Sequence, residues 1–343
     1  MRILKQILNR TKNQWKMTSN WWRGSLAGLL LVSFTAPVIA QTPVAEAPSS
    51  SAEYWFNQMS SALRELNFEA TLVKSSGARL EPMTWLHGVY EDGLEVELVV
   101  RLNGADVRSV RIGDDTSYYS QPSDSSYTLH SDVTYGLLPA AFYQPFENLQ
   151  PHYQVLVDRG MRVTGRSTYF LRILSRDNDR YHYGLWVDRK SGMLLKMQMT
   201  TPQGEVLEQI QLTTFVERES MPISLSDLRG VPRPPRLHEI RNMEPPQFSL
   251  EPQWLPAGFK LLRASHRRIA ETRLPSDYFL YTDGLTEVSI YVSQSQQQAL
   301  PELALKGPES LFNLNQGEFA ITVVGKLPVS TLQRIAESMQ PAT

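Results

Sequence analysis

The sequence predicts an α+β protein, in which a large antiparallel half-barrel wraps a helix and is followed by a smaller α+β domain. Three observations predict this class. Apolar and polar residues alternate over many short runs, tight-turn residues separate those runs, and a proline-rich segment divides the chain. A length of 343 residues suits two domains, and 41% hydrophobic with 20% charged residues is ordinary globular composition.

The first 40 residues predict a signal peptide. They hold six Lys and Arg residues and no acidic one, and they end in the apolar run GSLAGLLLVSFTAPVIA. Val38 and Ala40 fit the small-x-small rule for cleavage before Gln41. An uncleaved anchor is the alternative, but the run is shorter than the ~20 residues of a membrane-spanning helix. Met17 is a second candidate start. We expect a soluble periplasmic protein after cleavage. Its mature chain would hold 28 Lys and Arg residues and 35 Asp and Glu residues, which gives a net charge of −7.

This charge balance gives no general attraction for nucleic acid. Cysteine is absent, which excludes disulfides, thiolate metal sites and a lipid anchor on cysteine.

The large domain is expected over residues 52–217. It begins with an amphipathic helix that carries Trp55, Met59 and Leu63 at helical spacing. Two-residue periodicity then predicts strands at 68–74, 83–90, 94–102, 106–112, 152–158, 161–166, 168–175, 181–187 and, as a hairpin, within 188–212. The apolar, proline-broken segment 135–146 is expected to be a short helix or a lid.

A proline-rich, charge-balanced segment over residues 218–246 predicts a semi-rigid linker. A smaller α+β domain follows over 247–340. Its strands are expected at 258–265, 277–283, 285–294 and 318–326, and its closing amphipathic helix at 328–340.

One predicted strand of the large domain has a face that is unusually rich in methionine. Met193, Leu195, Met197 and Met199 point to the same side, because strand side chains alternate. Methionine adapts to irregular surfaces, so this face either seals a core or lines a cavity for an apolar ligand. Phe142 and Tyr143, in an aromatic stretch of the same domain, are further candidates for such a cavity.

Catalytic and metal-binding signals are weak. The sequence has no nucleophile elbow, no HExxH motif, no phosphate-binding loop and no dinucleotide fingerprint, and its six histidines are scattered. Acidic pairs such as Asp114-Asp115 are expected in turns. We therefore predict no enzyme activity, no cofactor and no metal. A basic stretch of the small domain, with Arg263, Arg267, Arg268 and Arg273, is either a solvated face or a docking surface for an acidic partner.

Several segments resemble one family. PQWLPAGFKLLRASHRRI, SDYFLYTDGLTEVSIYV and FAITVVGKLPVSTLQRIAESM, with YHYGLWVDRKSGMLLKMQMTTPQGEVLEQIQLTTF in the large domain, are similar to the MucB/RseB family of sigma-E regulators. The resemblance covers nearly the whole mature chain. Tyr281 and Asp283 belong to one of its most specific motifs and join the four arginines as candidate partner-binding residues.

The resemblance implies a periplasmic negative regulator of the envelope-stress response in a Gram-negative bacterium. Such a protein binds the periplasmic domain of an inner-membrane, RseA/MucA-like anti-sigma factor and shields it from proteolysis. It is released by lipopolysaccharide or another acylated ligand. The resemblance also implies that the large domain is like the periplasmic lipoprotein carriers, with an apolar cavity, which favours the cavity for the methionine face. A periplasmic lipid or lipoprotein carrier is the alternative function, a hydrolase is a third, and a homodimer stays open.

Overall fold

A computed structural model describes residues 51–121, 125–130, 136–236, 244–268, 275–295 and 303–341. The predicted signal peptide and Arg273 lie outside these ranges, and for Arg267 and Arg268 only the backbone is described. Within the described ranges, no helix is long and apolar enough to cross a membrane.

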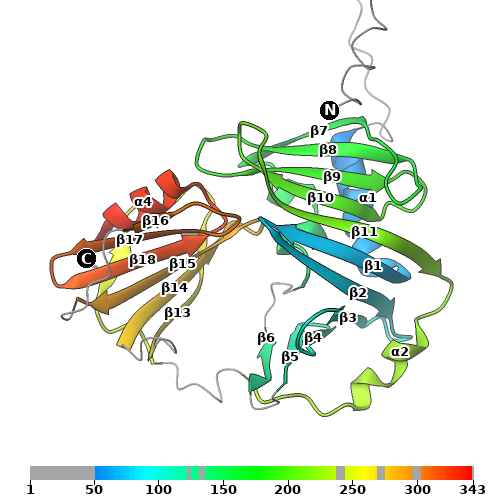
Figure 1. Cartoon of the computed structure of the whole chain (residues 1–343), viewed down its shortest axis with the longest axis horizontal. Coiled ribbons are helices and arrows are strands. Elements are labelled where there is room, and N and C mark those ends of the chain that lie inside the picture. Colours follow the sequence, from blue (N-terminus) through cyan, green and yellow to red (C-terminus); the bar gives the residue numbers. More distant parts are fainter. Residues whose placement is uncertain are drawn as a thin grey trace, which may run out of the picture. The chain divides into compact units, whose positions relative to one another are not determined.

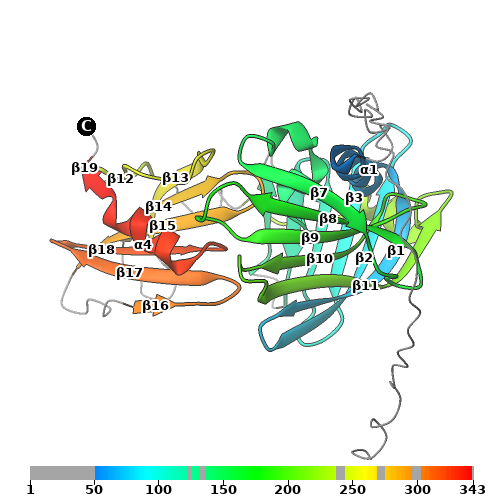
Figure 2. The same ribbon diagram turned by 90° about the horizontal axis from the view of Figure 1, so that it is seen from above.

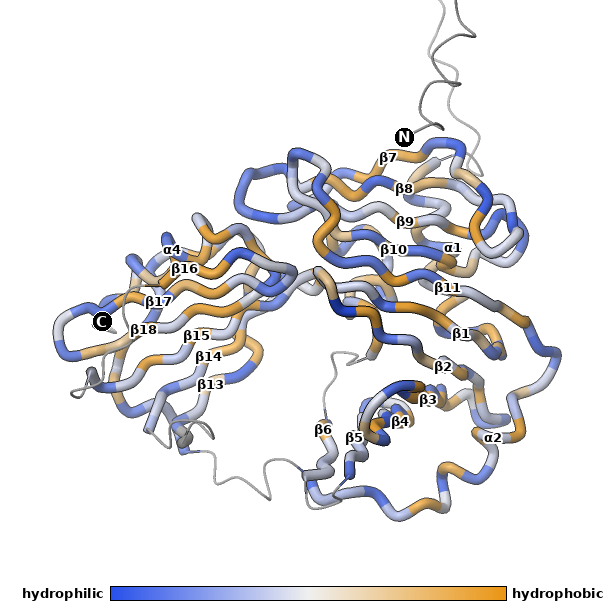
Figure 3. The backbone as a smooth tube through the Cα atoms, viewed as in Figure 1, coloured by the Kyte–Doolittle hydropathy of each residue, from blue (hydrophilic) through white to orange (hydrophobic). Residues whose placement is uncertain are grey.

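The predicted fold class is confirmed by one large antiparallel sheet and a second, smaller one (Figure 1). Among the described residues the large sheet has eleven strands in the order β6-β5-β4-β3-β2-β1-β11-β10-β9-β8-β7. Figure 3 shows the alternation of hydropathy along these strands. Their bounds are β1 Asn67–Ser76, β2 Arg79–Val89, β3 Glu95–Arg101, β4 Arg108–Ile112, β5 Asp115–Tyr119, β6 Tyr127–His130, β7 Tyr153–Arg159, β8 Thr168–Ser175, β9 His182–Asp188, β10 Leu194–Thr200 and β11 Val206–Arg218.

Helix α1 (Ala52–Glu65) lies on the concave face of this sheet (Figure 2). It begins at Ser51, whose hydroxyl accepts a hydrogen bond from the backbone N–H of Tyr54 at 3.1 Å. Its buried face includes Phe56, Met59 and Leu63. The helix packs on β7, β8, β10 and β2, so the sheet and helix share one core.

The apolar segment predicted as a short helix or lid forms two 3₁₀ helices, η3 (Ala140–Tyr143) and η4 (Phe146–Asn148). Pro139 and Pro145 precede them and interrupt the helical hydrogen bonding. Both pack against α1 inside the core.

The small domain is a sheet of six strands, within the part of the chain that is described, with the order β13-β14-β15-β18-β17-β16. Helix α4 (Val329–Glu337) packs on β17 and β18 and buries Leu332, Ile335 and Ala336. The strands are β13 Lys260–Arg268, β14 Pro275–Thr282, β15 Glu287–Gln294, β16 Leu303–Leu305, β17 Ser310–Gln316 and β18 Phe319–Gly325, and a separate pair joins β12 Leu250–Pro252 to β19 Met339–Pro341.

The segment predicted as a linker differs from the prediction in its first half. Residues 219–236, which we call the strap, include the short helices α2 (Ile223–Ser226) and η5 (Asp227–Gly230) and run along the large sheet. Leu225 is fully buried in a cluster with Val96 and Val110. This apolar contact holds the strap on β3 and β4, within the segment that was predicted as a semi-rigid linker.

Polar contacts fix the strap along its length. Arg229 donates to both carboxylate oxygens of Asp92 at 2.7 and 2.8 Å. Farther on, the backbone N–H of Thr128 in β6 donates to the carbonyl of Pro235 at 2.9 Å. The outer edge of β6 is therefore partly covered, and residues 237–243 of the predicted linker lie outside the described ranges.

Candidate functional site

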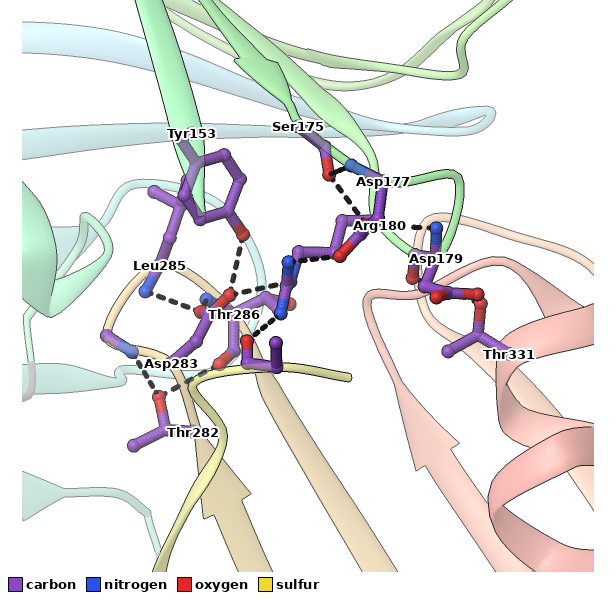
Figure 4. A network of polar contacts seen from close by, with 12 residues as sticks. Tyr153, Ser175, Asp177, Asp179, Arg180, Thr282, Asp283, Leu285, Thr286 and Thr331 are labelled. Carbon is purple, nitrogen blue, oxygen red and sulfur yellow. Dashed lines mark hydrogen bonds and ion pairs between the residues drawn. The ribbon is translucent and has the colours of Figure 1, made fainter. Parts of the chain in front are cut away.

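A buried ion pair joins the two sheets. Arg180 lies in the loop between β8 and β9, and Asp283 lies in the turn between β14 and β15 (Figure 4). The Nε of Arg180 is 3.1 Å from Oδ2 of Asp283, and the two side chains are 1% and 0% exposed. Charges this well buried require partners, because desolvation otherwise costs several kcal/mol.

Further partners surround the pair. The Tyr153 hydroxyl donates to Oδ2 of Asp283 at 2.6 Å, and Nη1 of Arg180 donates to Oδ2 of Asp177 at 2.5 Å. Nη2 of Arg180 also donates to the carbonyl of Ala257. Burial, and then the Asp283 carboxylate, raise the pKa of Tyr153 well above its ordinary value. Tyr153 is therefore a neutral hydrogen-bond donor in this network.

The turn that carries Asp283 enters the large domain. Oδ1 of Asp283 accepts hydrogen bonds from the backbone N–H groups of Leu285 and Thr286 at 3.0 and 2.9 Å. Gly284 has a φ of +89°, which strains other residues, and its carbonyl accepts from the N–H of Ala141 at 2.8 Å. The Leu285 side chain is buried in the core of the large sheet. One turn thus contributes a carboxylate and an apolar anchor to the junction.

A second ion network bridges the sheets nearby. The Glu208 carboxylate on β11 is 2.9 Å from Nζ of Lys326, in the small domain, and 3.5 Å from Nζ of Lys74 on β1. Burial alone would raise the pKa of Glu208, but Lys326 and Lys74 outweigh it and the pKa is lowered. Glu208 therefore stays ionised between two ammonium groups.

Two hollows adjoin this junction. One of about 280 Å³ is lined by residues of both sheets, including Met197, Tyr183, Leu285 and Lys326. Another of about 300 Å³ lies on the concave face of the large sheet. Its lining includes Met83, Val99, Tyr118, Arg101 and Arg108, and both hollows share Lys74, Gly136 and Leu137. Both linings mix apolar side chains with charged ones of both signs. The cations are Lys74, Lys326, Arg101 and Arg108, and the carboxylates are Glu81, Glu208, Glu287 and Glu309.

The residues predicted to line a lipid cavity are brought together, but mostly in packed core. Met193, Leu195 and Met199 are fully buried, as are Phe142 and Tyr143, and all belong to the cluster under α1. Met197 alone of the methionine stripe lines the 280 Å³ hollow, and a void of about 10 Å³ lies behind it. The stripe therefore runs from the core to the edge of a hollow.

Three of the residues predicted to bind a partner have described side chains, and these lie in different surroundings. Tyr281 is buried in the core of the small domain and Asp283 in the junction, while Arg263 is half-buried on β13. The predicted arginine cluster cannot be followed further, because the side chains of Arg267 and Arg268 and all of Arg273 lie outside the described part of the chain.

Sequence reasoning missed Arg180, which follows an acidic turn and carries no motif of its own. Its position at the junction is evident only from its contacts with residues that are distant in the sequence. Over the described ranges, no group of three or more His, Asp or Glu side chains is arranged to hold a metal ion.

Comparison with known proteins decides the family. Residues 51–232 match the MucB/RseB N-terminal domain, and residues 244–340 match the MucB/RseB C-terminal domain. The chain belongs to the MucB/RseB family. It is 28% identical over 326 residues to the sigma-E factor regulatory protein RseB of Escherichia coli K12, covering 94% of this chain and 98% of RseB.

Two further comparisons agree with this family assignment. The RseB protein of Haemophilus influenzae is 29% identical over 298 residues, covering 87% of this chain and 93% of that protein. A solved MucA/MucB complex of Pseudomonas aeruginosa contains a chain that is 25% identical, with a TM-score of 0.67 over 85% of this chain and 99% of that chain.

Proposed function

We propose that this protein is a periplasmic negative regulator of a sigma-E-type envelope-stress response. It binds the periplasmic domain of a membrane-bound, MucA/RseA-like anti-sigma factor and shields that domain from proteolysis. The observation that carries the proposal is the match to both MucB/RseB domains in the same order, together with a solved MucB that is in complex with MucA.

The junction supports a role in which both domains act on one partner. The Arg180–Asp283 pair and the Glu208–Lys326 pair hold the two sheets together through buried or nearly buried carboxylates. A partner that contacts both sheets then meets a preorganised surface, which reduces the entropy cost of binding.

Release by an acylated ligand is the second part of the proposal. The 300 Å³ hollow places Arg101 and Arg108 beside apolar side chains, which suits an amphiphile with an anionic head group and apolar chains. Such a head group would take the place of Glu81 and Asp106, with which the two arginines are paired in this structure. Met197 lines one hollow and Met83 the other, and methionine side chains adapt readily to acyl chains.

The experiment is a pull-down of the protein by the tagged periplasmic domain of the anti-sigma factor from the same genome. We expect a stable complex, slower cleavage of the tagged domain by its site-1 protease, and release when lipopolysaccharide is added. A chain that binds lipopolysaccharide but never the tagged domain would support the lipid or lipoprotein carrier and overturn the regulator.

Two variants locate the ligand. Val99→Asp places a charge in the 300 Å³ hollow and is expected to abolish release while the complex still forms. Val216→Asp places the same charge at an exposed position of β11 and serves as the matched control. If both variants release the partner as the parent does, the acylated ligand binds elsewhere.

A further inference from the structure

A compact group of cations surrounds two loops of the large domain. With the strand residue that precedes each, these loops are residues 159–167, from the end of β7 to β8, and residues 188–191, which follow from the end of β9 toward β10. We call their cationic side chains the basic face: Arg159, Arg162, Arg166, Arg189 and Lys190. The loops hold one carboxylate, Asp188, and it is buried. This local excess contrasts with the net charge of −7 expected for the mature chain.

The two loops are fixed against each other. Arg166 pairs with Asp188 at 2.9 Å, and the backbone N–H of Arg189 donates to the carbonyl of Ser167 at 3.0 Å. Thr168 holds the loop from the other side, because its hydroxyl donates to the carbonyl of Met161 at 2.6 Å. The basic face is therefore a built surface on ordered backbone.

Most of its charge is available to a partner. Arg159, Arg162, Arg189 and Lys190 are exposed, and none of them takes part in an ion pair with a carboxylate of the described residues. Met161 lies between the first two and is 65% exposed, although it is a large apolar side chain. Burial of the Met161 side chain in an apolar layer would be favourable, and the cations on either side of it carry no ion pair within the described part of the chain.

Aromatic rings extend the same surface. Arg189 lies over the ring of Tyr169 at 4.5 Å, and Tyr169 packs on Trp55 of α1 with ring centroids 4.4 Å apart. Trp55 in turn contacts Tyr54, which is partly exposed. Tyr and Trp favour the boundary between water and lipid, where one part of the ring is apolar and another polar.

We propose that the basic face docks on an anionic phospholipid bilayer, with Met161 entering the head-group layer. Free cations attract the negatively charged surface, the apolar tip gains from burial, and the rings match the interface. The Tyr169 and Trp55 rings beside the cations favour a bilayer, and an acidic protein partner is the alternative that the test below separates. Docking here leaves the hollows and the junction, which are lined by other residues, free for the functions proposed above.

The test is co-sedimentation of the protein, expressed from the full-length chain, with vesicles of phosphatidylethanolamine and phosphatidylglycerol. We expect binding that falls with added salt and is lost on phosphatidylcholine vesicles. A triple variant with Arg159→Gln, Arg162→Gln and Lys190→Gln should bind 10- to 100-fold more weakly, on the order expected for three surface cations. The intact mass of each preparation must show that residues 1–40 are absent, since an uncleaved apolar segment binds any vesicle.

The matched control removes three exposed cations elsewhere, through Arg79→Gln, Lys260→Gln and Lys306→Gln, and should bind as the parent does. Met161→Ser should weaken binding without changing its salt dependence. Equal loss in the control triple would reduce the effect to net charge and overturn the proposal. Binding of the parent to an acidic protein partner but not to anionic vesicles would overturn it as well.

Discussion

The concave face of the large sheet has two halves that carry similar side chains and differ in what covers them. Over β7, β8 and β10 the helix α1, with the segment η3 packed against it, closes the face, and Leu195 and Met199 are fully buried. Over β2, β3 and β5 the face opens into the 300 Å³ hollow, lined by Met83, Val99 and Tyr118. The same alternation therefore produces core in one half and cavity wall in the other.

This difference shows that the alternation of apolar and polar residues in a strand identifies the side chains on the inner face of the sheet. It does not identify the element that packs on them. Helix α1 is 14 residues long and covers part of a sheet of eleven strands. Met197 lies at the boundary, since it packs in the core cluster and also lines the junction hollow. Substitutions on either side of this boundary can test the division.

The largest contrast is expected between Leu195→Asp and Val99→Asp. An unpaired carboxylate at position 195 is buried under α1 and should cost several kcal/mol, enough to prevent folding. Val99 is 9% exposed in the same core cluster but borders the hollow, so water can reach a carboxylate there and the loss should be smaller, about 1–3 kcal/mol. Urea denaturation of both variants measures the free energies of unfolding. Two equally unfolded variants would mean that the hollow half is packed as tightly as the sealed half.

The next effect concerns the junction that borders the hollow half. Asp283→Ala removes the carboxylate from buried Arg180 and Tyr153, and it should lower the free energy of unfolding by about 3–5 kcal/mol. Asp283→Asn keeps the shape and the hydrogen-bond acceptor and should cost less. Chemical denaturation and limited proteolysis compare the two. Losses under 1 kcal/mol in both would show that the ion pair does not stabilise the junction.

Alanine substitutions in the methionine stripe locate the boundary between the covered half and the hollow half more precisely. Met199→Ala leaves a cavity in packed core and should cost about 3 kcal/mol. Met197→Ala enlarges an existing hollow, so its cost should be nearer 2 kcal/mol. Thermal and urea denaturation give both values. A larger loss at position 197 than at 199 would place Met197 in the sealed half.

The smallest effect is a pH dependence at the junction. Because Lys326 and Lys74 lower the pKa of Glu208, the stabilisation is present above the unfolded carboxyl pKa of about 4.3 and is lost as the pH falls through the lower folded value. Lys326 is partly exposed, so solvent screens the pair and about 1 kcal/mol is expected. Stability measured from pH 7 to 3 should fall less for Glu208→Gln. Identical slopes in parent and variant would contradict this assignment.

Local patterns predicted much of the fold. Helical spacing around Met59 and Leu63 predicted α1, and two-residue alternation with turn residues predicted most strands of both sheets. The strand expected at 161–166 was wrong, because these residues form the loop between β7 and β8, with a single bridge between Val163 and Arg166. The packing of the strap could not be predicted because its contacts are long-range: Leu225 packs with Val96 and Val110, and nothing near Leu225 in the sequence indicates this. For the same reason Arg180 carried no signal, since its partner Asp283 is about a hundred residues away. Alternation placed the methionine stripe on the inner face but could not say which element covers it.

The pairing of β1 with β11 determines the order in which the strands of a newly synthesised chain can pair. Asn67 pairs with Arg218, and the strands between them form two hairpin series that meet only at this seam. A chain that is synthesised from its N-terminus can form β1 to β6 from neighbouring segments. Its sheet can close only after residue 218 has emerged, and such distant pairing is slow. Until then the edge of β1 stays open to other chains, so the delay before β11 arrives is the interval in which a holding chaperone would matter most.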